Sequence, residues 1–318
     1  MKAAQINSYG GVDVLEITQN VPKPSASEGQ VLVEVYAASI NPFDWKVREG
    51  YAKAYIKLQF PTTIGGDFAG VVIGLGEKTS DFTVGDEVYG QAAVYAGGTG
   101  AFAEFLAASV GKIARKPQKA DFFEAASLPL VGASALQALE EHIKLAKGQK
   151  ILIHGGAGGI GTIAVQLAKV LGAYVATTVS GDDVEYAKGL GADEVIDYKT
   201  QKFEEMLKDF DAVYDTVGGE TTNKSFKVLK AGGIIVSMAG QPSMELGQKH
   251  GVRVIGQNTE GNRERLNRLS EFVESGKIKP HVDKIFPIGE IKEAFSHLEK
   301  GHPRGKVVVK IKDETKLK

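Results

Sequence analysis

The apolar residues of this chain follow two different patterns along its length. In the first ~125 residues they come in short runs, as where Val31, Val33 and Val35 alternate with other side chains. Such alternation predicts strands with one face more deeply buried. Glycine, proline and aspartate separate these runs, and many short strands of this kind predict a small barrel-like domain. Further strands are expected at Gly70–Ile73, Glu87–Tyr89, Ala103–Ala107 and Lys112–Ala114.

Beyond Lys116 and Pro117 the pattern predicts alternating helices and strands, which is typical of a doubly wound parallel sheet. Strands are expected at Ile151–His154, Tyr174–Val179, Glu194–Asp197, Ala212–Thr216, Ile234–Met238 and Val252–Gly256. Helices are expected at Ala120–Ser127, Ala133–Ala146, Thr162–Leu171, Asp183–Leu190, Lys202–Lys208, Glu220–Leu229 and Asn262–Ser275. The tail is expected to add a helix at Ile291–Lys300 and a strand at Gly305–Ile311.

A glycine-rich turn joins the strand at Ile151 to its helix. Gly156, Gly158 and Gly161 have the G-x-G-x-x-G spacing, with Gly159 and Ile160 between them. A strand before the glycines and a helix after them make this motif informative. Glycines let the backbone approach a pyrophosphate, and the helix N-terminus offers unpaired N–H groups. We therefore expect a dinucleotide here; the alternative is a glycine-rich turn that binds nothing.

Composition narrows the classes of function. The 318 residues suggest two domains, and a formal net charge of −1 gives no argument for nucleic acid or an anionic membrane as partner. The absence of cysteine excludes disulfides, thiol catalysis and thiolate metal sites. We find no signal peptide and no membrane span in the sequence, so we expect a cytoplasmic protein.

Several sequence blocks, in one order, resemble a known family: Gly11–Glu16, Ala37–Asp44, Gly65–Gly70, Gly85–Gly90, Ala125–Pro129, His154–Gly161, Leu190–Tyr198, Asp215–Gly219 and Gly305–Val309. They are similar to zinc-independent medium-chain dehydrogenases/reductases of the quinone (enone) oxidoreductase branch. The resemblance implies a GroES-like β-barrel domain made from residues 1–124 and 284–318. It implies a Rossmann dinucleotide-binding domain made from residues 125–283, so that the tail returns to the first domain.

The same resemblance implies that no metal is bound. Zinc-dependent relatives carry a cysteine where this chain has Asn41 and a histidine where it has Gly66, and neither replacement is a normal zinc ligand. Alcohol oxidation is disfavoured without zinc, because no metal ion polarises the carbonyl or the alkoxide. Hydride addition to a quinone or an enone stays feasible, because these acceptors spread the incoming charge onto oxygen.

NADPH is the expected cofactor. The end of the second Rossmann strand, Ala176–Ser180, lacks the acid that holds the ribose 2′-OH in NAD enzymes. Ser180 is placed to donate to a 2′-phosphate, and Tyr198 matches a position that meets this phosphate in NADPH-using relatives. The alternative is that both are ordinary surface residues. Relatives often carry lysine after the serine, whereas here we expect Asp182 and Asp183 to point to solvent at a helix start.

The resemblance and the strand ends also indicate residues near the nicotinamide. Ser134 stands where relatives have a threonine, and three residues follow strand ends that face the cofactor: Val217, Ala239 and Asn258. His154 lies within a strand, and we interpret it as structural.

Catalytic candidates lie in the segment Asn41–Tyr51, and we expect them to meet the substrate in a cleft between the domains. Asn41 is a neutral donor at the former metal position, or else a cap for the turn at Pro42. Lys46 is a cation for the nicotinamide ribose or for a developing enolate oxygen, or else a solvated lysine. Tyr51 is suited to wall a flat acceptor.

These observations predict an NADPH-dependent oxidoreductase that transfers a hydride to a quinone or an α,β-unsaturated carbonyl without zinc. Two alternatives stay open, an enoyl-thioester reductase and an NADPH-binding or sensing protein without efficient chemistry. We expect a homodimer and no partner beyond the small-molecule substrate.

Overall fold

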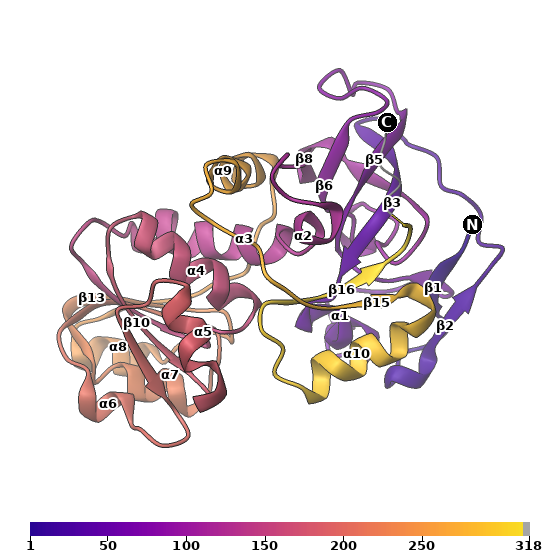
Figure 1. Ribbon diagram of the computed structural model, residues 1–318. Coiled ribbons are helices and arrows are strands. Elements are labelled where there is room, and N and C mark those ends of the chain that lie inside the picture. Colours follow the sequence, from indigo (N-terminus) through magenta and orange to yellow (C-terminus); the bar gives the residue numbers. More distant parts are fainter. Residues whose placement is uncertain (314–318) are drawn as a thin grey trace. The chain divides into compact units, whose positions relative to one another are not determined.

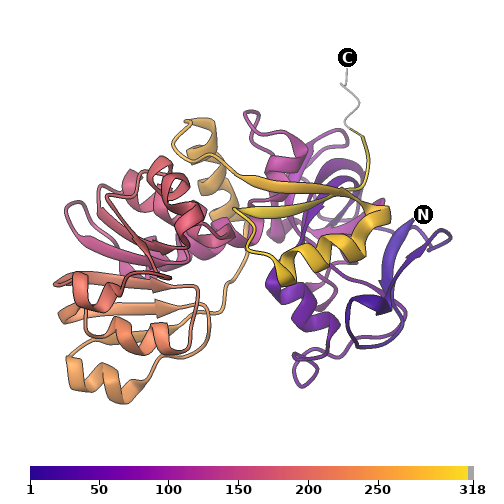
Figure 2. The ribbon, with the colours of Figure 1, turned by 60° about the horizontal axis from the view of Figure 1, so that its bottom comes forward.

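The computed structural model describes residues 1–313, which form two compact units. Among the described residues, the first unit contains Met1–Leu130, Gly261–Gly276 and residues 280–313, and the second contains Val131–Glu260 and Lys277–Lys279. In Figures 1 and 2 the yellow C-terminal elements lie beside the indigo N-terminal strands. The first unit is therefore assembled from both ends of the chain.

The first unit is organised around β3 (Gln30–Ser39). Within the described residues β3 belongs to a seven-stranded sheet of order β15–β16–β3–β5–β6–β8, and β7 also pairs with β3. The Val31, Val33 and Val35 side chains are fully buried, as their alternation predicts. The other strands are β5 (Asp67–Leu75), β6 (Glu87–Gln91), β7 (Phe105–Ser109), β8 (Ile113–Arg115), β15 (Val282–Pro287) and β16 (Lys306–Lys310). A small second sheet contains β1 (Ala3–Ile6), β2 (Leu15–Thr18) and β4 (Thr62–Thr63).

The tail returns to this unit, as the family resemblance implies. Strand β16 pairs antiparallel with β3, with Val308 opposite Ser39. Helix α10 (Ile291–Lys300) buries Phe295 in the same apolar core as Phe102. Strand β15, which the sequence pattern did not predict, pairs in parallel with β16.

The second unit is a doubly wound parallel sheet, as predicted. Among the described residues its order is β11–β10–β9–β12–β13–β14, so the order reverses between β9 and β12, where such sheets bind ligands. The strands are β9 (Lys150–His154), β10 (Tyr174–Val179), β11 (Glu194–Asp197), β12 (Phe210–Asp215), β13 (Leu229–Ser237) and β14 (Arg253–Gly256). The helices between them are α4 (Gly159–Val170), α5 (Val184–Gly189), α6 (Phe203–Met206), α7 (Glu220–Ser225) and α8 (Met244–His250).

Two predicted helices differ from those observed. The segment predicted as Ala133–Ala146 is α3 (Pro129–Leu136) followed by a π-helical stretch, Gln137–Ile143, which ends at Lys144 with φ 56°. The helix predicted to reach Leu229 ends at Ser225, because Leu229 already begins β13.

The predicted domain boundary at residues 125–283 needs a correction. Helix α2 (Phe122–Ala126) and helix α9 (Arg263–Glu274) both belong to the first unit. The Tyr89 hydroxyl donates to the Leu266 carbonyl at 2.6 Å, and the Arg263 guanidinium donates to the Val110 carbonyl. These bonds hold α9 on the first unit, although it follows the last Rossmann strand in sequence.

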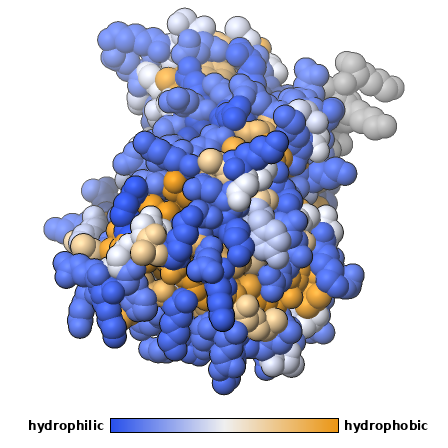
Figure 3. All heavy atoms as spheres, turned by 90° about the vertical axis from the view of Figure 1, so that its left-hand side faces the viewer, coloured by the Kyte–Doolittle hydropathy of each residue, from blue (hydrophilic) through white to orange (hydrophobic). Residues whose placement is uncertain are grey.

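The surface shown in Figure 3 is mostly hydrophilic, with smaller apolar areas between the polar side chains. Exposed large apolar side chains of the second unit include Tyr198, Met206, Val217 and Met244. No helix between residues 1 and 313 is long and apolar enough to cross a membrane.

Helix α1 (Pro42–Arg48) carries most of the predicted catalytic segment, and one buried cation attaches it to the rest of the unit. The Arg48 guanidinium lies 2.7 Å from carboxylate oxygens of both Glu49 and Glu299, and its Nε donates to the Gly10 carbonyl at 3.1 Å. The Arg48 side chain is fully buried, and its guanidinium carbon lies 5.2 Å from the ring centre of Phe295. Arg48 thus joins α1 to α10.

We predict that Arg48→Ala lowers the free energy of unfolding of the first unit by about 3 kcal/mol, because it leaves a cavity and unpaired acceptors. Trp45 is the chain's one tryptophan and lies in α1, so its fluorescence during urea unfolding follows this unit. Lys78→Ala is the control, since its ion pair with Glu28 is exposed and contributes at most about 1 kcal/mol. A loss below about 1 kcal/mol for Arg48→Ala would contradict the prediction.

Candidate functional site

The glycine turn lies between β9 and α4, with Gly158 as the N-cap of the helix. The backbone N–H groups of Gly155 and Gly156 both donate to the Thr178 carbonyl at 3.1 Å, which fastens the turn to β10. A Cβ at Gly156 would lie 2.1 Å from Thr177 Oγ1, and one at Gly161 would lie 2.1 Å from the Gly155 carbonyl oxygen. Any side chain at these two positions would therefore force the turn apart.

Gly158 is different, because it has space in front of it. A Cβ there would meet nothing closer than the Gly155 carbonyl oxygen at 3.4 Å. Gly159 and Ile160 form the first turn of α4, where backbone N–H groups have no partner inside the helix. The turn thus offers donors and open space at the positive end of a helix, a combination suited to an anion such as a pyrophosphate.

His154 lies in β9 directly before this turn, and both of its ring nitrogens are engaged in contacts with hydroxyl groups. Its Nδ1 lies 2.9 Å from Thr178 Oγ1 and its Nε2 lies 2.9 Å from Ser225 Oγ. The imidazole is fully buried, and burial lowers its pKa to about 4. His154 is therefore neutral at neutral pH and joins β9, β10 and α7, in agreement with its interpretation as structural.

At the end of β10, Asp183 does not point to solvent as we expected. The Ser180 hydroxyl donates to Asp183 Oδ2 at 2.7 Å, and both side chains are buried. The expectation that Asp183 points to solvent is therefore wrong, whereas Asp182 is exposed. Tyr198 follows the neighbouring strand β11, donates its backbone N–H to the Val179 carbonyl, and has a half-exposed ring.

The predicted nicotinamide-side residues of the second unit follow the strands on the other side of the switch point. Val217 follows β12, Ala239 follows β13 and Asn258 follows β14, so all three lie at the same sheet edge as the glycine turn. Val217 is 55% exposed, and its N–H is held by Asp215 Oδ1 at 2.9 Å. Ser134 is fully buried, and its hydroxyl lies 2.7 Å from Thr259 Oγ1.

Asn41 lies in a buried network of charged groups. Its Nδ2 donates to Asp67 Oδ2 at 2.9 Å, and its Oδ1 accepts a bond of 2.6 Å from the Lys306 ammonium. Lys306 also donates to the Ile40 carbonyl, and Asp44 Oδ2 accepts from the Asn41 backbone N–H at 2.7 Å. The Asn41 residue is only 3% exposed. Its amide connects the start of α1 to β5 and β16. Asn41 is also the N-cap residue of α1, where it forms a capping box with Asp44.

Burial shifts the proton affinities of this network. It raises the pKa of the Asp44 carboxyl to about 7 and also raises the pKa of Asp67. Burial lowers the pKa of the Lys306 ammonium, against the attraction of the two carboxylates. Asp67 is further held by Gln91 Nε2 at 2.9 Å and by the Leu130 backbone N–H at 3.1 Å. Two acids and one base therefore lie close together in the buried interior of the unit.

Sequence reasoning assigned no role to Asp67 or Lys306, although both stand in blocks that carried the family resemblance. The one local signal in the sequence was a charged residue next to apolar residues. Lys306 immediately precedes the apolar run Val307–Val309, and Asp67 stands between glycines and Phe68.

Lys46 and Tyr51 present a different side of the same segment. Lys46 is exposed, and its Nζ lies 5.7 Å from the ring centre of Trp45. Tyr51 is 72% exposed, and its ring meets that of Trp45 edge to face at 5.9 Å. Trp45 itself packs on the apolar core of the unit. Lys46 and Tyr51 are therefore accessible to a ligand, whereas Asn41 is enclosed.

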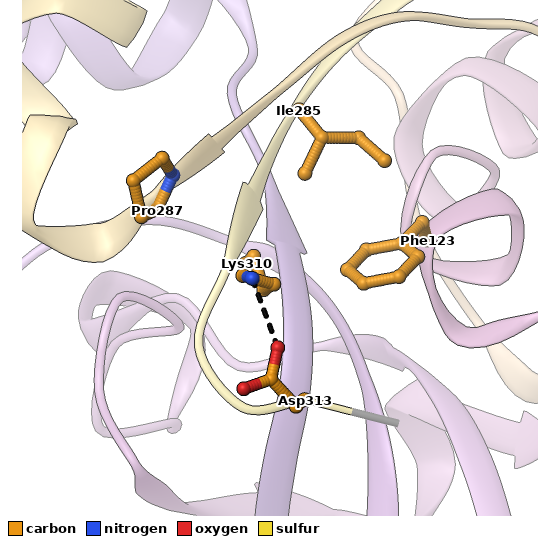
Figure 4. A pocket seen from close by; sticks show the side chains of 5 residues that line it. All are labelled: Phe123, Ile285, Pro287, Lys310 and Asp313. Carbon is orange, nitrogen blue, oxygen red and sulfur yellow. Dashed lines mark hydrogen bonds and ion pairs between the residues drawn. The ribbon is translucent and has the colours of Figure 1, made fainter. Parts of the chain in front are cut away.

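A pocket of about 430 Å³ elsewhere in the first unit has no part in this arrangement. Its lining residues are Phe123, Ile285, Pro287, Lys310 and Asp313 (Figure 4). The Lys310 ammonium donates to Asp313 Oδ1 at 2.9 Å, so the two charges in the lining compensate each other.

We predict that Asp44 makes the first unit less stable as the pH rises from about 4 to about 7. The folded carboxyl has a pKa of about 7, above the value of about 3.9 expected in the unfolded chain. Its contribution to stability is complete below the unfolded pKa and is lost as the pH rises through the folded pKa, by at most about 1.4 kcal/mol per pH unit.

Asp44→Asn keeps an acceptor for the Asn41 N–H but removes this titration, so the decline of stability with pH should become shallower. Urea unfolding followed by Trp45 fluorescence between pH 4.5 and 7 measures it, and Asp13→Asn, at an exposed position, is the control. Parallel curves for the parent and Asp44→Asn would refute the assignment.

Comparison with known proteins places these features in a family. A family model described as an alcohol dehydrogenase GroES-like domain matches residues 27–118, and one described as a zinc-binding dehydrogenase matches residues 190–309. The 2-methylene-furan-3-one reductase of Solanum lycopersicum is 41% identical, with 97% of this chain and 79% of that protein covered. The chloroplastic NADPH-dependent alkenal/one oxidoreductase of Arabidopsis thaliana is 39% identical over the same shares.

Comparison with solved structures leads to the same family. The quinone oxidoreductase from Coxiella burnetii superposes with a TM-score of 0.90 at 36% identity, covering 98% of this chain and 99% of that one. These comparisons confirm the family that the sequence blocks indicated. The chain belongs to the medium-chain dehydrogenase/reductase family, together with relatives that are quinone and enone oxidoreductases.

Proposed function

We propose that the chain is an NADPH-dependent oxidoreductase that reduces a quinone or an α,β-unsaturated carbonyl without zinc. The observation that carries the proposal is the glycine turn, which is closed to side chains at Gly156 and Gly161 and open in front of Gly158. The dependence on NADPH is supported by the alkenal/one oxidoreductase relative, and the acceptor classes by that relative and by the quinone oxidoreductase.

The residues of the second unit fit a bound dinucleotide. Gly158, Gly159 and Ile160 offer the helix N-terminus to the pyrophosphate. Ser180 and Tyr198 stand at adjacent strand ends for the adenosine ribose and its phosphate. The nicotinamide side is assigned to the remaining candidates, namely Ser134, Val217, Ala239 and Asn258. When bound, NADPH supplies the hydride.

The independence from zinc is supported by what lies at Asn41. The Lys306 ammonium already bonds to Asn41 Oδ1 and to the Ile40 carbonyl, and a dication beside it would be repelled. Among the described residues no group of three or more histidines, cysteines, aspartates or glutamates is arranged to hold a metal ion. We therefore assign the negative charge that develops on the acceptor's oxygen to protein donors.

Lys46 and Tyr51 are the proposed groups that meet the substrate, because both are exposed on the segment that replaces a metal-binding loop. The Lys46 ammonium would hold the oxygen on which charge develops, and the Tyr51 ring would lie against a flat acceptor. We assign Asn41 an indirect role. Its amide already bonds to Asp67 and Lys306, so it positions α1 and does not contact the acceptor. The homodimer and the cytoplasmic location stay predictions.

The direct test is consumption of NADPH by the pure protein with a simple quinone, a short enone and an enoyl thioester, beside a metal analysis. Reduction of the quinone or the enone supports the proposal. Binding of NADPH without turnover of any acceptor would favour a sensing protein, and turnover of the thioester alone would favour the enoyl reductase. Stoichiometric zinc would refute the metal-free reaction.

Lys46→Met should lower kcat/KM by about tenfold with either acceptor and leave the Kd of NADPH unchanged. Loss of an oriented donor at an oxyanion typically costs about 10²- to 10³-fold in turnover, and a conjugated acceptor that spreads its charge should lose less. Lys53→Met removes an exposed lysine two residues beyond this segment and should have no effect. If Lys46→Met weakens only NADPH binding, Lys46 anchors the cofactor instead.

Gly158→Val should abolish NADPH binding while the protein stays folded. Gly158 has φ −73° and ψ 174°, an extended conformation that valine adopts readily, but the added methyl groups would fill the space in front of the turn. Fluorescence titration and circular dichroism measure the two properties. Gly189→Ala, where a Cβ meets no atom within 4 Å, is the control. Unchanged affinity in a folded Gly158→Val protein would place the pyrophosphate elsewhere.

A further inference from the structure

The hydroxyl of Ser180, which the proposed function assigns to the 2′-phosphate of NADPH, already has an acceptor. It donates to Asp183 Oδ2 at 2.7 Å, and the Asp183 N–H donates back to the Ser180 carbonyl at 2.8 Å. Ser180 is 9% exposed and Asp183 is 8% exposed. Two bonds within one turn therefore hold the carboxylate beside the hydroxyl, away from bulk water.

A second carboxylate lies on the other side of this turn. A Cβ at Gly181 would come within 3.0 Å of Asp197 Oδ2. Asp197 is opposite Val179 at the end of β11, and its carboxylate is fixed by the Lys199 N–H at 3.0 Å and the Thr200 hydroxyl at 2.8 Å. The strand end that faces the adenosine ribose thus carries a negative charge on each side of Gly181.

We propose that Asp183 is a specificity-determining residue that weakens the preference for NADPH over NADH. This inference rests on the proposed function and concerns the same dinucleotide site. A serine hydroxyl can donate one hydrogen bond. To receive this bond, a 2′-phosphate must replace the Asp183 carboxylate as the acceptor. The phosphate must then lie near a carboxylate of the same sign of charge.

NADH meets no such conflict. Its 2′-OH is both a donor and an acceptor, so it can donate to Asp183 while Ser180 keeps its bond. For NADPH, the 2′-phosphate and the Asp183 carboxylate repel each other because both are negative. We expect this repulsion to weaken NADPH binding about tenfold, which corresponds to about 1.4 kcal/mol. The parent chain should therefore bind both cofactors.

The experiment measures the Kd of NADPH and of NADH by fluorescence titration for the parent and for Asp183→Asn. Asparagine keeps an oxygen that accepts from Ser180 but has no charge. We expect the affinity for NADPH to rise about tenfold and that for NADH to change by less than about threefold. The gain should shrink as salt is added, because it is electrostatic. Ser180→Ala should lower the affinity for NADPH.

Asp182→Asn is the matched control, since it removes the same charge from the exposed neighbouring residue. An equal gain in Asp182→Asn would show that net charge alone sets the preference and would overturn the role of Asp183. Unchanged NADPH affinity in Asp183→Asn would also overturn it. So would equal losses for both cofactors in Asp183→Asn and in Asp183→Ser, which retains a hydroxyl. If the parent and every variant bind neither cofactor, the proposed function fails instead.

Discussion

The first unit depends on one buried ammonium. Lys306 bonds to Asn41, a residue 265 positions away in sequence, and to the carbonyl of Ile40. The same amide of Asn41 bonds to Asp67, so β16, α1 and β5 meet at one charge. Removing a buried charge whose partners remain costs several kcal/mol, because the partners are left unpaired without water. The position of Lys46 on α1, and of Tyr51 just after this helix, therefore depends on a network that is itself buried.

In the second unit, neutral groups hold the glycine turn in place. Thr178 accepts from two glycine N–H groups through its carbonyl and bonds to His154 through its hydroxyl. His154 continues this contact to Ser225 on α7. Because burial keeps the histidine uncharged near neutral pH, the chain of bonds does not change with moderate changes of pH. A turn held in this way needs little reorganisation when an anion arrives.

The sequence predicted the second unit well because each of its strands contains a short apolar run and is followed by a turn. The strands Tyr174–Val179 and Glu194–Asp197 have the predicted bounds. The sequence did not predict that α9 belongs to the first unit. An amphipathic pattern indicates which face of a helix is buried but not which unit covers that face. Strand β15 carries three exposed residues in a row and has no alternation to detect. The network at Asn41 was missed because a bond between residues 41 and 306 leaves no local pattern.

The assembly of the first unit from both chain ends has a consequence for the order of events during synthesis. The ribosome releases β3 early, but its partner β16 emerges only after the whole second unit has been made. The second unit consists almost entirely of one continuous segment, so it can complete its fold while the first waits. During this interval the Ala37–Ser39 end of β3 lacks its partner strand β16, and Asn41 lacks the Lys306 ammonium. The second unit should thus complete its fold before the unit that carries the catalytic candidates.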